Sequence, residues 1–148
     1  MGFEALKANT TAAANVAVGQ STLLSNTTGA TNTAIGHTAM NQNTTGTDNT
    51  GLGVSALANN TTASNNTAVG KNSMFANTTG ADNSALGAFT LDANTTGYNN
   101  VAVGKSALGA NTEGFSNTAL GLNSLDANTT GDHNTAVGMG SLTANTTA

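Results

Sequence analysis

A single repeated phrase accounts for almost the whole chain. "NTAVGKNSMFANTTGAD" covers residues 66–82, and close variants of it follow one another without insertion or deletion. Full copies start at residues 15, 32, 49, 66, 83, 100 and 117, with a partial copy at 1–14 and another at 134–148. A fixed period of this length is typical of solenoid proteins. We therefore expect one repeat domain over residues 1–148.

Positions within a copy are numbered 1–17 from its invariant Asn. Position 3 is Ala except for Gly51, position 4 is Val, Ile or Leu, and position 5 is always Gly. Position 9 is Leu or Met, positions 12–13 are always Asn-Thr, and position 15 is Gly or Ala. A copy lacks the apolar stripe of an amphipathic helix, and its fixed Gly and Thr residues are poor helix formers. Short strands between turns suit this pattern better.

The period predicts an all-β chain, a parallel β-solenoid (β-roll) of about nine 17-residue coils. We expect one strand at positions 1–5 and a second at positions 8–13, with corners at 6–7 and 15–17. Because side chains alternate across a strand, positions 4 and 9 would point inward. Gly at positions 5 and 15 would serve corners that need a positive φ.

Position 3 would then face outward, and its constant small size needs a reason. A freely solvated position would vary as positions 6 and 10 do, so a column of Ala predicts close approach by another chain. The alternative is a tight sheet that tolerates only small residues. The predicted subunit interface of a homotrimer consists of Ala17, Ala34, Ala68, Ala85, Ala102, Ala119 and Ala136.

Two Asn columns predict ladders in which each side-chain amide bonds to the coils above and below. Most position-12 Asn residues also lie in glycosylation sequons, but Asn111 is retained although Glu113 removes its sequon. This favours the ladder over modification. The position-1 ladder comprises Asn15, Asn32, Asn49, Asn66, Asn83, Asn100, Asn117 and Asn134. The position-12 ladder comprises Asn9, Asn26, Asn43, Asn60, Asn77, Asn94, Asn111, Asn128 and Asn145.

Composition argues against several other functions. Three Lys and no Arg leave no basic patch for nucleic acid, and no apolar run is long enough for membrane insertion. Without Cys, and with His37 and His133 in different columns, neither a metal site nor a cofactor is indicated. Asp48 and Asp82 share one column and Asp92 and Asp126 another, but no catalytic constellation can be assembled around either pair. We expect no enzyme, and hence no catalytic residues.

Regular Thr columns suggest an alternative function. Arrays of hydroxyl and methyl groups on a flat solenoid face resemble those of several antifreeze proteins, which would make the chain an ice-binding solenoid. Thr is also simply a favourable strand residue. The adjacent Thr-Thr pair would point to opposite faces, which argues against a single ice-binding array.

The phrases "NNTAVGKNSM", "TNTAIGHTAM" and "NNVAVGKSAL" resemble a known repeat. It is the Asn-x-x-Ala-Val/Ile-Gly-x-x-Ala/Ser unit in the heads of trimeric autotransporter adhesins, and "ALxANTTG" resembles bacterial and phage tail-fibre repeats. The resemblance implies a left-handed, trimeric β-roll with a sticky surface. The family's repeat is usually nearer fourteen residues, and the additional residues here fall around Asn-Thr-Thr.

Together these features predict a structural or adhesive fibre element, such as an adhesin head, a tail-fibre shaft or a self-assembling filament. We expect it outside the cell, on the cell surface or in a virion fibre, with a host surface or glycan as ligand. Neither end of the chain carries a polar cap, and the last coil of one copy could continue into the first coil of the next. This predicts end-to-end filaments; the alternative is a fragment of a longer array.

Overall fold

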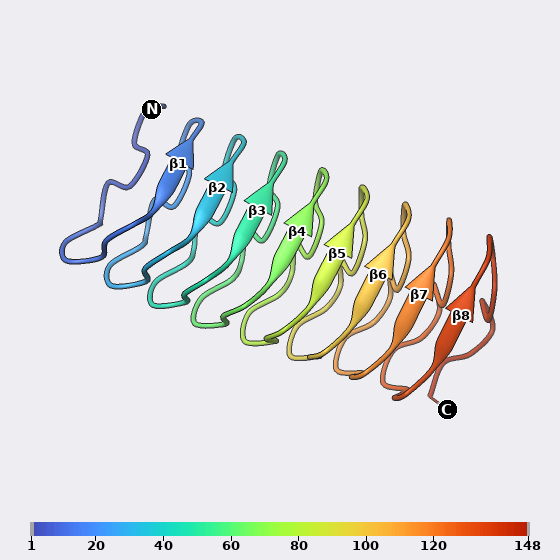
Figure 1. Ribbon diagram of the computed structural model, residues 1–148. Coiled ribbons are helices and arrows are strands. Elements are labelled where there is room, and N and C mark those ends of the chain that lie inside the picture. The colour runs from blue at the N-terminus through green and yellow to red at the C-terminus, as the bar shows by residue number, and fades with distance from the viewer. Residues whose placement is uncertain (1, 148) are drawn as a thin grey trace.

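The computed structural model describes residues 2–147, so that Met1 and Ala148, the outermost residues of the two partial copies, lie outside it. One short strand occurs in each copy, and the eight strands form a single parallel sheet in chain order (Figure 1). The strands are β1 (Val16–Val18), β2 (Thr33–Ile35), β3 (Thr50–Leu52), β4 (Thr67–Val69), β5 (Ser84–Leu86), β6 (Val101–Val103), β7 (Thr118–Leu120) and β8 (Thr135–Val137).

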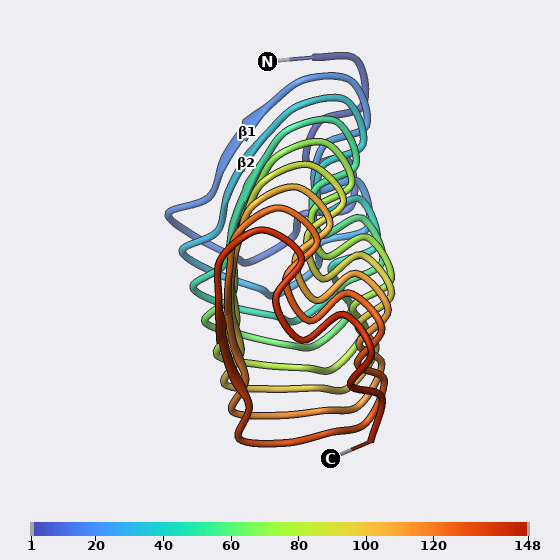
Figure 2. The ribbon, with the colours of Figure 1, turned by 90° about the vertical axis from the view of Figure 1, so that its right-hand side faces the viewer.

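The molecule is a parallel β-solenoid of 17-residue turns. The register is constant: Ala68 of β4 pairs with Ala85 of β5, which pairs with Ala102 of β6. From the start of β1 to the start of β8 the chain completes seven turns. Figure 2 shows the coils as nested, elongated loops, with one straighter side carrying the strands and an opposite side with several bends. The all-β solenoid predicted from the period is confirmed over these turns.

The expected second strand at positions 8–13 is wrong. Positions 6–11 form turns in which positions 7 and 9 have positive φ, for example 57° at Ser55 and 52° at Leu57. This alternation sends successive N–H groups to opposite neighbours. Ser55 N–H donates to the His37 carbonyl of the preceding coil at 2.9 Å, and Leu57 N–H donates to the Ser73 carbonyl of the following coil at 3.0 Å. The side opposite the sheet is therefore hydrogen-bonded from coil to coil without being a strand.

The expected facing of the first strand is also wrong. In β4 the middle residue, Ala68, is buried, whereas Thr67 and Val69 on either side are more exposed. The same pattern recurs in every strand, so position 3 points inward and position 4 outward. The predicted interface residues are therefore core residues of one chain: Ala17, Ala34, Ala68, Ala85, Ala102, Ala119 and Ala136.

The thinness of the coil explains this inversion. A Cβ placed on Gly51 would lie 3.0 Å from Met40 Cγ and 3.3 Å from the Ala56 carbonyl oxygen on the opposite side of the coil. Only Ala or Gly fits in such a space, because packed interiors leave no voids for longer side chains. The bulky position-4 residues cannot enter and face outward instead.

The core is a stack of three kinds of side chain. Fully buried Leu or Met at position 9, including Leu57 and Met74, packs against the Ala column and against small residues at position 8, such as Ala56 and Ser73. The two Asn columns lie at the ends of this apolar strip and are buried as well.

The two recurring glycine positions of the repeat have different causes. Position 5 has positive φ from Gly19 to Gly138, for example 137° at Gly53, as expected. Position 15 does not, so the expectation of a positive-φ corner there is wrong. A Cβ on Gly29 would instead lie 2.3 Å from the Gly46 carbonyl oxygen and 2.6 Å from Asn26 Oδ1, so the reason for glycine is close approach. Ala63, at the same position, shows that a small shift of the backbone accommodates one methyl group.

Candidate functional surface

The outer face of the sheet carries two columns of side chains, which together we call the sheet face. Position 4 supplies an aliphatic column, with Ile35 42% and Leu86 51% exposed. The column consists of Val18, Ile35, Leu52, Val69, Leu86, Val103, Leu120 and Val137. A contiguous apolar strip of this kind is unusual on a soluble monomer and marks an interaction surface.

Position 2 supplies a second column beside the first. Thr33, Thr50 and Thr67 follow one another in the parallel register, and Thr118 and Thr135 form a second run. Ser84 and Val101 lie between these runs. The sheet face thus combines hydroxyl groups and methyl groups at the constant coil spacing of about 4.8 Å.

The position-12 Asn residues form a continuous ladder of side-chain hydrogen bonds. Asn77 Nδ2 donates to Asn60 Oδ1 at 3.0 Å, and Asn94 Nδ2 donates to Asn77 Oδ1 at 2.8 Å. Each amide also donates within its own coil, as Asn77 Nδ2 does to the Gly80 carbonyl at 2.9 Å. A glycan on such a buried nitrogen would break both bonds.

The position-1 Asn residues close the coil from the other side. Asn66 Nδ2 donates to the same Gly80 carbonyl at 2.9 Å, and Asn66 Oδ1 accepts from the backbone N–H of Asn83 at 3.0 Å. Two Asn side chains thus converge on one carbonyl in each coil, and each also bonds to a neighbouring coil. Among the described residues, no buried side-chain nitrogen or oxygen lacks a hydrogen-bond partner. These amides hold the corner together and are not available for a ligand.

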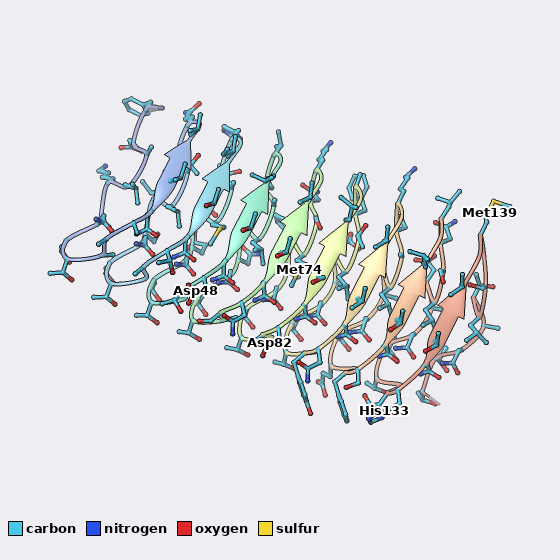
Figure 3. The ribbon with its side chains drawn as sticks, viewed as in Figure 1. Asp48, Met74, Asp82, His133 and Met139 are labelled. Carbon is cyan, nitrogen blue, oxygen red and sulfur yellow. The ribbon has the colours of Figure 1, made fainter. Side chains whose placement is uncertain are left out.

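Charged residues occupy the two edges of the sheet face. The cation edge, directly after the strands, consists of His37, Lys71 and Lys105 at position 6, and all three are exposed. The acid edge, directly before the strands, consists of Asp48 and Asp82 at position 17, also exposed. In Figure 3 Asp48 and Asp82 lie along the lower edge of the sheet, whereas Met139, another position-6 residue, lies at the upper edge. The hydroxyl of Thr31 donates to Asp48 and holds the pKa of that carboxyl below its usual value.

A second acidic pair lies on the side away from the sheet. Asp92 and Asp126 approach each other over Gly109, where an added Cβ would lie 2.7 Å from Asp126 Oδ1 and 3.6 Å from Asp92 Oδ1. Partial burial of Asp92, together with the negative charge of Asp126, raises the pKa of Asp92. Gly109 therefore provides the space in which these carboxylates of coils two apart meet.

An aromatic stack occupies the same corner as the acid edge, nearer the C-terminus. The rings of Tyr98 and Phe115 stack in parallel with centroids 4.8 Å apart, and His133 meets Phe115 edge-on at 5.1 Å. The sequence signal for this stack is its spacing, because Tyr98 and Phe115 occupy the same position of adjacent copies. Treating the variable positions only as solvated misses that alignment.

Within residues 2–147 the structure contains no cavity and no group of three or more His, Cys, Asp or Glu side chains placed to hold a metal ion. The same residues include no helix with the length and apolar character needed to cross a membrane.

Comparison with known proteins gives this surface no counterpart. No protein-family model matches the chain, and neither the curated proteins nor the solved structures include a significant match.

Proposed function

We propose that this protein is a non-enzymatic structural or adhesive element of a fibre outside the cell, on a cell surface or in a virion. Three copies would associate side by side as left-handed β-rolls to form a rod. The observation that carries this proposal is the exposed aliphatic column of the sheet face. Burying such a column on association would contribute about 25 cal/mol per Å² of apolar surface.

The dimensions of the sheet face are adequate for a stable contact. Eight strands at about 4.8 Å, and roughly six residues across the strands and both edges, give about 35 Å by 20 Å. This is ~700 Å² per copy, close to the approximately 800 Å² per partner that specific protein interfaces bury. The interface is moved from the predicted Ala column to the position-4 column, because the alanines are buried within one chain.

Analytical ultracentrifugation tests the proposal. The wild-type chain is expected to sediment as a trimer, and a variant with Ile35, Leu86 and Leu120 changed to Thr is expected to sediment as a folded monomer. A control with Thr45, Thr79 and Thr96 changed to Ser alters three exposed position-14 residues elsewhere on the coil and should remain trimeric. A wild-type chain that is monomeric at all concentrations would refute the association.

Two further measurements test the remaining parts of this proposal. Electron microscopy separates short rods from filaments formed by end-to-end stacking. Binding of protein-coated beads to cells or to immobilised glycans separates an adhesive head from an inert shaft.

The Thr column supports a second candidate function, ice binding. Thr33, Thr50 and Thr67 present hydroxyl and methyl groups at regular spacing on the outside of a flat parallel sheet. Ice binding requires this face to be open in solution, whereas fibre assembly requires it to be covered. A monomer with thermal hysteresis, lost when Thr50 and Thr67 are changed to Lys, would favour ice binding; a trimer without hysteresis would favour the fibre element.

A further inference from the structure

The charges on the two edges of the sheet face share one period. His37, Lys71 and Lys105 on the cation edge follow one another at intervals of two copies, and Asp48 and Asp82 on the acid edge are also two copies apart. Two coils separate successive charges by about 9.6 Å on both edges. The phases agree too, because His37 and Asp48 lie in the copy starting at residue 32, and Lys71 and Asp82 in the copy starting at residue 66.

Within the described part of the chain, these edge charges form no ion pair. The ion pair that residues 2–147 contain joins Lys7 to Glu4, away from the sheet face. Lys71 Nζ lies 5.7 Å from the centroid of the Phe89 ring, and Asp82 Oδ1 accepts the side-chain amide of Asn65 at 3.0 Å. Both edges are therefore exposed and able to meet charges from outside the chain.

We propose that neighbouring copies associate with their rods parallel and level, the cation edge of one copy lying against the acid edge of the next. This inference rests on the proposed association through the sheet face and specifies its orientation and register. A rotation about an axis parallel to the rod brings each cation edge to an acid edge and preserves the level of every coil. Lys71 then faces Asp82 of the neighbouring copy, and His37 faces Asp48.

Other arrangements fit the charges less well. A two-fold axis perpendicular to the rod would place two cation edges together and two acid edges together, and like charges across an interface are strongly unfavourable. A parallel arrangement shifted by two coils would pair Lys71 with Asp48 and Lys105 with Asp82. That shift cannot close into a ring and would uncover part of the apolar column, because a heterologous contact with a translation generates an open fibre.

Charge reversal within one coil tests the register. At low salt, Lys71→Asp and Asp82→Lys are each expected to weaken association about tenfold, or about 1.4 kcal/mol, as measured by sedimentation equilibrium. The double variant Lys71→Asp/Asp82→Lys restores the pair in the level arrangement and should recover most of the wild-type affinity. The differences should shrink in 1 M salt, where the Debye length is about 3 Å.

Matched controls carry the same charge changes elsewhere. Lys7→Asp and Glu113→Lys alter exposed side chains away from the sheet face and should leave association unchanged. The variant Lys71→Asp/Asp48→Lys would recover affinity only in the shifted arrangement, so its recovery would overturn the level register. A wild-type assembly that is indifferent to all edge reversals would overturn the inference but leave the proposed fibre function standing. A monomeric wild-type chain would overturn both.

Discussion

At the scale of the residue, backbone conformation explains which aliphatic side chain stands where. Position 9 is held at positive φ, between 50° and 55° in every described copy, and contains only Leu and Met. Left-handed conformation costs an L-residue about 1–2 kcal/mol and is most unfavourable for β-branched side chains. Position 4 lies in a strand, where branching at Cβ is favourable, and Val and Ile occur there.

This difference gives a matched pair of substitutions in one coil. Leu57→Ile, at φ 52°, is expected to lower the free energy of unfolding by about 1–3 kcal/mol through backbone strain and poorer packing. Leu52→Ile makes the same chemical change in β3 and should alter stability by less than about 0.5 kcal/mol. Urea denaturation followed by circular dichroism measures both, and equal effects would contradict the backbone explanation.

Two glycines separated by one residue should respond oppositely to the same change. Gly51 has no positive φ, and the atoms nearest its added Cβ belong to the flexible side chain of Met40. Ala85 already stands in the equivalent position beside Met74, so Gly51→Ala should stabilise the chain by about 0.4–1 kcal/mol. Gly53→Ala should destabilise it, because φ is 137° and the new Cβ would lie 2.6 Å from the Gly70 carbonyl oxygen. Thermal melts that shift in the same direction for both variants would refute this account.

At the scale of the coil, the sequence predicts some features and conceals others. The period, the parallel stacking and the absence of helix follow from the repeat alone. The inward face of the strand does not, because alternation allows either parity, and placing the bulkier residue inside selects the wrong one. The better signal is constancy along the chain: positions 1, 3 and 5 hold Asn, Ala or Gly with the one exception of Gly51 for Ala, whereas positions 2 and 4 vary.

The turns opposite the sheet are less predictable. Leu and Met at positive φ carry no turn signature of the kind that Gly, Asn or Asp provides. Leu57 and Met74 are therefore easily assigned to a strand, although hydrogen bonds to both adjacent coils hold them in turns. The Asn columns are easier to interpret, since an amide can donate to one coil and accept from another, and the structure places Asn60, Asn77 and Asn94 in that arrangement.

The acidic pair between coils gives a pH-dependent prediction. The pKa of Asp92 is raised in the folded chain above its ordinary value of 3.8, so on raising the pH the unfolded chain loses this proton first. Ionisation of Asp92 therefore disfavours folding as the pH rises through and above that value. Asp92→Asn should raise the melting temperature at pH 7 but have little effect at pH 3. Asp132→Asn serves as a comparison, and a gain for Asp92→Asn that is the same at both pH values would contradict the assignment.

At the scale of the whole molecule, every coil contacts only the coils before and after it. Each strand pairs only with its sequence neighbours, from β1 to β8, as Figure 1 shows. Stability in such a chain is approximately a sum of coil terms and nearest-neighbour interfaces. A defect therefore has an effect that depends on its place along the rod as well as on its local chemistry.

One overpacking substitution at two levels tests this property. Ala68 in β4 and Ala136 in β8 are both buried at the middle of their strands, and Val at either site would be forced into the narrow coil. Ala68→Val interrupts the rod between coils that depend on each other and should destabilise it by about 1–3 kcal/mol. Ala136→Val has fewer coils beyond it and should only release the last coil, with a smaller change in the main melting transition. Hydrogen exchange should show the protection lost on both sides of β4 in the first variant and confined to the region around β8 in the second. Equal destabilisation and equally widespread loss of protection would mean that the rod unfolds as a single unit rather than coil by coil.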